Sequence, residues 1–364
     1  MIGGGTAGHV YPALAVAAAY RRVRPNVDVL FLGTRRGYEA RLVPQHGYRL
    51  ELVAGAPLYG VNLAGKLRAV AGVFAGAARA RRLFRRHRTQ LVIGFGGYTS
   101  AGPLLAARLL GISTAIHEAN VVPGLTNKWL SRVVDRVYLG FECAGRDILP
   151  GRRQVTGNPV RPQIAALSRE PHPPPRPAER RTRILVTGGS QGAHFFNQQA
   201  PGLLRCLAAR QIEVEVRHQV GETDPAPVAA AYAGSGIAAR VERYFEDIAD
   251  CYRWADFALA RAGAVTMAEL AVAGLPALLV PLPSAADDHQ TPNAAAWASE
   301  TGGWWVRETE WRVEVLAAGI AARLRDTADW TAASQRQRRW GIADAADKIV
   351  TDCEAMLLNN DQHR

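Results

Sequence analysis

The sequence predicts an α/β protein built from two doubly wound parallel-sheet domains that face each other across a cleft. Three observations predict this class. A glycine-rich turn that leads into a helix occurs near the start of each half of the chain, at Gly3–His9 and at 188–193. After both turns, short apolar strands alternate with helical stretches, a pattern typical of parallel sheets. A segment rich in proline and charge, 168–182, separates the halves and indicates an interdomain linker.

The composition is that of a globular protein. The 364 residues, 48% hydrophobic and 21% charged, suffice for two α/β domains with their own cores. Because no apolar run reaches the roughly 20 residues of a membrane span, we expect no such span, and we expect no secretory signal. The four cysteines are widely spaced and form no CxxC pair, which favours reduced thiols in a cytoplasmic protein over zinc or disulfides.

The net charge of +12 is concentrated in the first half of the chain. Residues 1–150 contain 20 Lys and Arg against 7 Asp and Glu, so the remainder is close to neutral. A basic half attracts an anionic membrane surface, a phosphorylated lipid or nucleic acid. Within it, 63–88 combines apolar residues with a basic run and resembles an amphipathic helix that touches lipid headgroups. A core-packed helix with a solvated basic tail is the alternative.

The first half opens on its glycine-rich turn with only Met1 and Ile2 before it, so the strand that should hold the turn is missing. His9 is the one titratable group in this loop, which makes it a candidate base near neutral pH. A hydrogen-bonding role at the helix entry is the alternative. Further strands are predicted at 27–33, 90–97, 113–120 and 136–141.

A second strand–glycine–helix junction of this half lies at 94–103, with Ser100 or Thr99 as the expected helix cap. Two glycine-rich loops in one basic domain indicate a second anion such as a diphosphate, although a tight turn beside a packed helix explains the pattern equally well. The stretch 117–120 ends a strand and brings a base, an acid and an amide to the crevice where such folds bind ligands.

The second half begins with a strand at 184–187 and the turn GGSQGA at 188–193. Backbone amides of such a turn approach an anion closely, at the positive end of the following helix. The turn lacks the Walker A lysine and the GxGxxG spacing, so a purely structural turn stays open. Further strands are predicted at 214–221, 239–245, 256–263 and 276–283.

Two later stretches of the second half carry polar candidates. Thr266 and Glu269 lie three residues apart at a helix start, as in a capping box. The alternative is that Glu269 accepts hydrogen bonds from ribose hydroxyls, the role of an acid in nucleotide-binding folds. His289 and Gln290, in the polar loop 283–297, suit a sugar, although loop polarity alone also explains them.

Eight motifs in series resemble those of the MurG family of glycosyltransferases over about residues 3–350. They are, in chain order, GGTAGHVYPALAVA, GFGGYTSAGP, HEAN followed by PGLTNKWLS, GNPVR, GGSQGAHFFN, RAGAVTMAEL, GLPALLVPLP and DDHQTPNA. The resemblance implies a GT-B fold and an inverting transfer of N-acetylglucosamine from UDP-N-acetylglucosamine. The acceptor it implies is the muramoyl 4-hydroxyl of undecaprenyl-diphosphate-linked muramoyl-pentapeptide (lipid I), which becomes lipid II.

The resemblance also implies no cofactor, no metal and no nucleic-acid partner, and the sequence contains no Asp-x-Asp pair that would hold a cation on the diphosphate. It implies a peripheral location on the cytoplasmic face of the cell inner membrane, against an anionic surface. The acceptor side is expected at 1–160, with a C-terminal helix at about 341–358 packing back on it. The UDP-N-acetylglucosamine side is expected at 161–340.

Site residues follow from the resemblance, with His9 as the favoured base for the muramoyl hydroxyl. The acceptor diphosphate is expected at the opening loop and the second glycine loop, at Gly5, Gly96, Gly97, Tyr98, Thr99 and Ser100. The donor is expected at Thr6, Ala7, Gly8, Asn120, Arg161, Ser190, Gln191, Phe245, Arg261, Ala264, Val265, Thr266, Glu269, His289 and Gln290.

Within that donor set the resemblance assigns separate tasks. Glu269 takes the ribose hydroxyls, and the Phe245 backbone meets uracil. Arg161 approaches the nucleotide or its diphosphate, while Arg261 and the 263–266 turn line the diphosphate. The sugar is faced by Asn120, His289 and Gln290.

The chain departs from the family pattern in its first residues. Family members have a strand before the opening loop, so we expect the natural chain to begin upstream; otherwise the edge of the acceptor sheet lacks the support that fixes His9. Ala7 replaces a usual glycine and Ala119 a usual glutamine. A methyl group at position 7 is expected to crowd an acceptor phosphate or to require a φ that alanine tolerates poorly.

Other functions stay open at this point. One is glycosyl transfer to another lipid acceptor such as diacylglycerol. Another is a truncated nucleotide-sugar-binding protein without activity. A dehydrogenase is disfavoured, because the chain lacks GxGxxG followed by an acidic residue at the expected distance.

Overall fold

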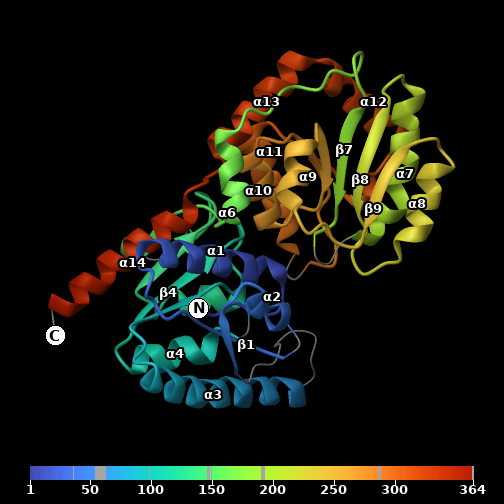
Figure 1. Ribbon diagram of the computed structural model, residues 1–364. Helices are drawn as coiled ribbons and strands as arrows, with labels where there is room; N and C mark the ends of the chain where they lie inside the picture. The colour runs from blue at the N-terminus through green and yellow to red at the C-terminus, as the bar shows by residue number, and fades with distance from the viewer. Residues whose placement is uncertain are drawn as a thin grey trace. The chain divides into compact units, whose positions relative to one another are not determined.

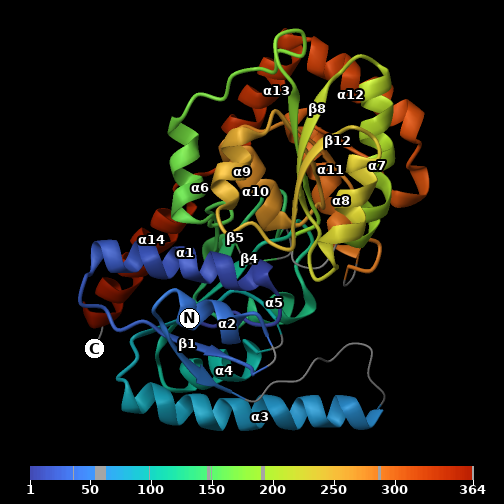
Figure 2. The same cartoon turned by 45° about the vertical axis from the view of Figure 1, so that its right-hand side comes forward.

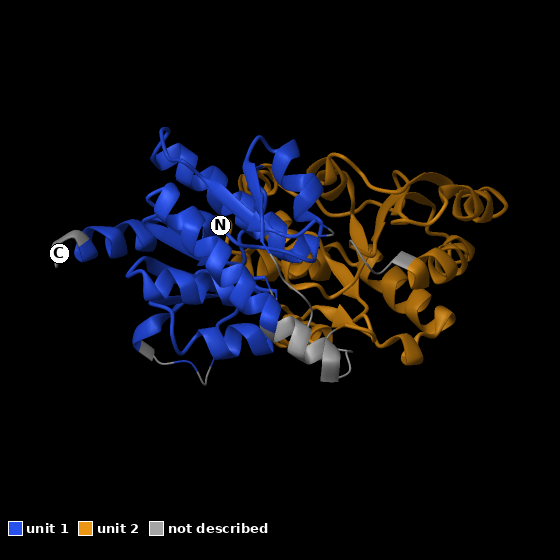
Figure 3. Ribbon diagram, turned by 90° about the horizontal axis from the view of Figure 1, so that it is seen from below, with its two compact units in different colours: residues 1–162, 344–364 blue, residues 163–343 orange. Residues whose placement is uncertain are grey.

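The computed structural model describes residues 1–362 except 36, 54–62, 98, 146–147, 149, 190–192 and 286–287. The chain forms two compact units, one of Met1–Pro162 with Asp344–Arg364 and one of Gln163–Ala343 (Figure 3). Each unit is a parallel sheet covered by helices, so the predicted α/β class is confirmed. Of the helices in the described part of the chain, none has the length and apolar character that crossing a membrane requires.

The sheet of the first unit is parallel throughout. Two strands pair at one side, β1 (Leu30–Gly33) and β2 (Arg49–Leu52). Four more follow in the spatial order β3 (Leu91–Gly94), β4 (Ser113–Glu118), β5 (Arg136–Leu139) and β6 (Arg153–Val155). A 3₁₀ turn, Pro150–Arg152, precedes β6.

Met1 and Ile2 lie in the middle of this sheet, between β1 and β3. The Ile2 amide donates to the Ile93 carbonyl at 2.8 Å, and the Ile2 carbonyl accepts from the Phe95 amide at 2.7 Å. On the other side, the Leu32 amide donates to the Met1 carbonyl at 2.9 Å. The expectation that only two residues before the loop would leave a sheet edge unsupported is therefore wrong, because the opening loop is anchored from two neighbouring strands.

Helices cover both faces of the first sheet (Figures 1 and 2). On one face lie α1 (Ala7–Val23), α2 (Glu39–Gln45) and α14 (Ala345–Gln362). On the other lie α3 (Leu63–Arg86) and α4 (Ala101–Leu109), and the short α5 (Leu125–Leu130) follows β4. Although α14 comes from the end of the chain, it packs against α1, where Arg22 and Asp347 form an ion pair at 2.8 Å.

The second unit holds six parallel strands in the spatial order β12-β11-β10-β7-β8-β9. Their bounds are β7 (Thr182–Thr187), β8 (Val214–Gln219), β9 (Ala238–Glu242), β10 (Phe257–Ala260), β11 (Ala277–Leu279) and β12 (Trp304–Trp305). The chain runs outward from β7 through β8 and β9 and then returns to β10 on the other side of β7. The strand order reverses between β7 and β10, and ligands of doubly wound folds bind at such a reversal.

Helices also sandwich the second sheet (Figure 1). One face carries α7 (Ala193–Ala209), α8 (Pro225–Ala233) and α12 (Val313–Arg325), which enclose a core with Phe196, Leu203 and Leu316. The other carries α9 (Ile248–Trp254), α10 (Ala264–Ala273) and α11 (Gln290–Thr301), with α13 (Thr327–Trp340) packed on α10 and α11. Short elements complete it: α6 (Pro162–Ala166) and the 3₁₀ turns Leu167–Arg169 and Glu308–Glu310.

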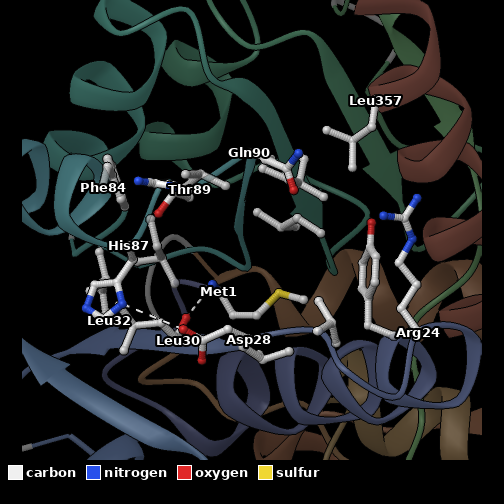
Figure 4. Close-up of a pocket in the computed structure, with 18 of the residues that line it drawn as sticks. Met1, Arg24, Asp28, Leu30, Leu32, Phe84, His87, Thr89, Gln90 and Leu357 are labelled. Atoms are coloured by element: carbon white, nitrogen blue, oxygen red, sulfur yellow. Dashed lines mark hydrogen bonds and ion pairs between the residues drawn. The ribbon is translucent and has the colours of Figure 1, made fainter. Parts of the chain in front are cut away.

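A cavity of about 430 Å³ lies at the amino ends of the first unit's strands (Figure 4). Leu30, Phe84, Leu91 and Leu357 line it, together with Met1. The Met1 amine donates to the Leu30 carbonyl at 2.8 Å, and burial lowers the pKa of this amine to about 5. None of the described predicted site residues lines the cavity, which lies at the end of the sheet opposite to the glycine loops.

Candidate functional site

In the first unit, the opening loop leaves the sheet at the carboxyl edge and enters α1 at Ala7. Gly5 has a φ of +92°, a left-handed conformation that glycine adopts without strain. Ala7 is the first helical residue, so the prediction that its position requires an unfavourable φ is wrong. Thr6 and Gly8 flank it, half-buried, where the helix begins.

The His9 side chain folds back onto its own loop. Its Nδ1 lies 3.0 Å from the Gly4 carbonyl oxygen and 3.4 Å from Thr6 Oγ1. Because a carbonyl only accepts, the ring nitrogen that faces it carries the proton. In the neutral imidazole Nε2 is then the unprotonated nitrogen, the form that a general base requires.

The second glycine loop packs directly on the first. Gly96 and Gly97 have φ values of +97° and +81°. A Cβ atom on Gly96 would lie 3.0 Å from His9 Nε2, and one on Gly97 would lie 2.8 Å from the Gly4 carbonyl oxygen. Side chains at these two positions would therefore force the two loops apart.

The hydroxyl residues of the second loop are turned inward. Ser100 is the N-cap residue of α4, as predicted, but its side chain makes no capping hydrogen bond, because Oγ donates to the Gly96 carbonyl at 2.9 Å. Thr99 is equally buried, and no hydrogen bond reaches its hydroxyl in the described structure. Tyr98 lies outside the described residues. Among the described residues of this loop, the glycine backbone is therefore the part that a ligand would meet.

One buried acid that sequence reasoning missed holds the opening loop from behind. Glu39, the first residue of α2, is 0% exposed. Its Oε2 accepts from the Gly5 amide at 3.0 Å, and its Oε1 accepts from the Thr34 amide and hydroxyl at 2.8 and 2.9 Å. The available signal was the pair Gly33 and Gly37, where any Cβ would collide with the Glu39 side chain.

The polar side chains at the end of β4 are mostly buried and hydrogen-bonded to neighbouring protein groups. Burial raises the pKa of the Glu118 carboxyl, while hydrogen bonds from Asn120, Gly124 and Asn127 oppose that shift. Burial also lowers the pKa of His117 to about 4. Of His117, Glu118 and Asn120, only Asn120 is partly exposed. Its backbone amide and its Nδ2 both donate to Glu118 Oε1, at 2.9 and 3.3 Å.

Arg161, a predicted donor residue, lies in the first unit beside α1. Its guanidinium carbon is 4.4 Å from the centroid of the Tyr11 ring, which is a cation–π contact.

In the second unit, the two predicted diphosphate turns leave neighbouring strands. Thr187 at the end of β7 pairs with Ala260 at the end of β10, so both turns start from the same edge. Gly189, with a φ of +64°, is close enough to α10 that a Cβ there would lie 4.0 Å from Thr266 Oγ1. Ser190 and Gln191 lie outside the described residues.

The first turn of α10 presents backbone amides at this edge, as anion sites do. The helix begins at Ala264, and Gly263 precedes it in extended conformation without a side-chain cap. Val265 and Thr266 are half-buried inside the helix, so the predicted capping box of Thr266 and Glu269 is wrong. Glu269 is 3% exposed and accepts from the Tyr252 hydroxyl at 3.0 Å.

Arg261 is more deeply engaged in the protein than the resemblance implies. Its side chain is 4% exposed, and Nη2 lies 2.6 Å from Glu308 Oε1. Nη1 donates to the Val280 and Pro281 carbonyls at 3.2 Å each. Burial lowers the pKa of this guanidinium and the Glu308 carboxylate opposes the shift. Part of its positive charge is thus already neutralised by a protein carboxylate.

The remaining donor candidates of the second unit lie on a loop or at the start of α11. The Phe245 amide is 3.5 Å from Gln219 Oε1, at the end of β8. Gln290 Oε1 accepts from the Leu282 amide at 3.0 Å, so this side chain braces the 282–290 loop. His289 directly precedes α11 and is half-buried.

The described part of the predicted membrane helix has two different faces. Ala80, Leu83 and Phe84 of α3 are buried, and α3 packs on α4. Phe74 is 72% exposed, and the arginines of the following turns are exposed beside it, at Arg79, Arg81, Arg82, Arg85 and Arg86. The described part of α3 is therefore core-packed along one face and basic along another, as the core-packed alternative predicts, and contact with lipid headgroups stays a prediction.

Within the described residues, no three His, Cys, Asp or Glu side chains group closely enough to hold a metal ion.

Comparisons with known proteins cover both halves of the chain. Residues 1–139 match the glycosyltransferase family 28 N-terminal domain, and residues 183–349 match the glycosyltransferase family 28 C-terminal domain. Two curated relatives are named UDP-N-acetylglucosamine--N-acetylmuramyl-(pentapeptide) pyrophosphoryl-undecaprenol N-acetylglucosamine transferase. The protein of Geobacter metallireducens is 39% identical over 357 residues, 96% of each chain. That of Magnetococcus marinus is 41% identical over 358 residues, 98% of this chain and 96% of the relative.

Among solved structures, Acinetobacter baumannii MurG superposes with a TM-score of 0.75. It is 31% identical in sequence, and the match covers 96% of this chain and 97% of that one.

Proposed function

The chain belongs to the MurG family of glycosyltransferases, and on that premise we propose that it transfers N-acetylglucosamine from UDP-N-acetylglucosamine to lipid I. The predicted family is confirmed, and with it the GT-B fold. The observation that carries the proposed reaction is the near full-length identity of about 40% to relatives named for it.

We assign the donor to the reversal point of the second sheet. The amides of Ala264, Val265 and Thr266 and the 188–193 turn would neutralise the departing diphosphate, since amides at a helix start favour an anion. Glu269, beside Tyr252, would accept hydrogen bonds from the ribose hydroxyls. Arg261 would contribute a charge weakened by Glu308.

We assign the acceptor to the paired glycine loops of the first unit. His9 Nε2 would take the proton of the muramoyl 4-hydroxyl as its oxygen bonds to C1 of the N-acetylglucosamine. The bond from C1 to the diphosphate oxygen breaks, UDP leaves with that electron pair, and the configuration at C1 inverts. In this assignment the charge that develops is met by peptide dipoles and the Arg261 guanidinium, without a metal ion.

A membrane location is part of the proposal. The exposed face of α3, with Phe74 and the arginines 79–86, combines an apolar anchor with basic charge. Such a face binds anionic headgroups. We propose that it docks on the cytoplasmic face of the inner membrane, where lipid I would be within reach.

The experiment that tests the function compares acceptors. Radiolabelled N-acetylglucosamine from UDP-N-acetylglucosamine is offered to a short-chain lipid I analogue and, separately, to diacylglycerol. Label in the lipid I analogue supports the proposal. Label in diacylglycerol alone would reassign the chain to another lipid acceptor, and donor binding without any labelled product would identify a binding protein.

A further inference from the structure

One peptide group of the opening loop is hydrogen-bonded on both sides by ionisable side chains. The Gly5 amide donates to Glu39 Oε2 at 3.0 Å. The Gly4 carbonyl oxygen is 3.0 Å from His9 Nδ1. These two groups are the N–H and the C=O of the same Gly4–Gly5 peptide, so a single planar unit separates the carboxylate from the imidazole.

We propose that Glu39 is a positioning residue that fixes the tautomer and orientation of His9 through the Gly4–Gly5 peptide. The proposal rests on the proposed function only in giving His9 the task of a base. The arrangement is a carboxylate–histidine pair with a peptide inserted between its members.

The physical reason is cooperative polarisation. A carboxylate that accepts from a peptide N–H draws that dipole into alignment and makes the carbonyl at its other end a stronger acceptor. The carbonyl then binds the protonated Nδ1 of His9 more firmly. In the opposite tautomer the Nδ1 lone pair would face the carbonyl lone pairs, which repel it.

The surroundings of Glu39 allow the carboxylate to do little else. Its other oxygen is occupied by the amide and hydroxyl of Thr34. A Cβ on Gly4 would lie 2.8 Å from Glu39 Oε1, and Gly33 and Gly37 likewise leave no room for side chains around it. Because the carboxylate has little room to shift, the Gly4–Gly5 peptide cannot rotate without losing its hydrogen bond to Glu39.

The Gly4–Gly5 peptide also connects the second glycine loop to His9. Gly97 approaches the Gly4 carbonyl oxygen so closely that a Cβ would lie 2.8 Å from it. A rotated Gly4–Gly5 peptide would therefore lose the Glu39 contact and disturb the 96–97 loop. Glu39 thus acts at a distance from the reacting atoms, through the loop it holds.

The test uses Glu39→Gln with Asp135→Asn as the matched control. In Glu39→Gln the side-chain oxygen can keep Thr34, but its NH₂ group then faces the Gly5 N–H, so two donors meet. Asp135 has the same kind of contact elsewhere in the unit, since its Oδ2 accepts from the Thr114 amide and hydroxyl at 2.9 and 2.8 Å. Asp135 directly precedes β5, at the amino ends of the strands.

The first readout is the tautomer of His9, from the ¹⁵N shifts of its ring at pH 8, assigned by their loss in His9→Ala. The wild-type protein is expected to carry the proton on Nδ1, and Glu39→Gln to give a mixture of tautomers. The second readout is transfer to the lipid I analogue. In Glu39→Gln we expect kcat to fall about 10- to 100-fold, by analogy with the loss when the partner that orients a metal-bound histidine is removed, with an unchanged KM for UDP-N-acetylglucosamine.

Asp135→Asn is expected to lower the melting temperature without changing the His9 tautomer, and Glu39→Asp to recover part of the lost kcat. An unchanged tautomer in a folded Glu39→Gln would overturn the proposal. So would a wild-type His9 protonated on Nε2, a result that stands even when Glu39→Gln does not fold. If the wild-type protein transfers no label, the proposed function fails, while the tautomer comparison still decides the role of Glu39.

Discussion

In a protein that begins at Met1, the buried amine of this residue makes the stability depend on pH in a way that one chemical change removes. The amine donates to the Leu30 carbonyl, and burial lowers its pKa from 8.0 to about 5. Between these values the unfolded chain binds a proton that the folded chain does not, so the free energy of unfolding rises with pH. The full shift of about three units in the pKa of the amine corresponds to about 4 kcal/mol in the free energy of unfolding, at about 1.4 kcal/mol per pKa unit.

The assay is urea unfolding at several pH values from 5 to 8, on the free-amine protein and on the same protein acetylated at Met1. Acetylation keeps an N–H for the Leu30 carbonyl and removes the charge, and the 430 Å³ cavity that Met1 lines offers space for the acetyl group. Histidines such as His117 add their own pH dependence to both forms. Because the amine of the folded chain is half-protonated at pH 5 and that of the unfolded chain at pH 8, the free-amine protein should gain about 3 kcal/mol more than the acetylated one over this range. Equal slopes in the two forms would refute the reasoning.

Three further predictions concern the site and the membrane face. Glu269→Ala should weaken UDP binding about 10- to 150-fold in calorimetry, the worth of hydrogen bonds to a charged acceptor, and Tyr252→Phe should weaken it far less; equal affinities for wild type and Glu269→Ala would remove the ribose role. His9→Ala should lower kcat by at least about 100-fold, the contribution of a general base, at unchanged UDP affinity, and full activity would eliminate it as the base. Binding to anionic vesicles should fall with rising salt and fall further in Phe74→Ser, whereas salt-independent binding would contradict electrostatic docking.

The sequence predicted the fold class because its central strands are apolar and buried. Each predicted strand overlaps an observed one, for example 113–120 with β4 (Ser113–Glu118). The strands that sequence reasoning missed, β2, β6 and β12, are short and incompletely buried. Without a continuous apolar run, such strands give no local pattern to detect.

The candidate site was less predictable, because side-chain partners come from distant parts of the chain. Arg261 is a loop arginine in the sequence, yet Glu308 lies 47 residues away from it. Glu39 and Gly5 are 34 residues apart, so no local motif joins them. Thr266 and Glu269 have capping-box spacing, but the helix begins three residues earlier than that motif requires. Spacing identifies residue types, whereas the tertiary fold decides which of them meet.

The central claim is that the chain transfers N-acetylglucosamine with inversion at C1 and without a metal ion. The most direct test is a reaction of ¹³C-labelled UDP-N-acetylglucosamine with the short-chain lipid I analogue in excess chelator, followed by NMR of the product. We predict a β-linked sugar on the muramoyl 4-hydroxyl at the rate seen without chelator. An α-linked product, or turnover that stops when the chelator is added, would contradict the account.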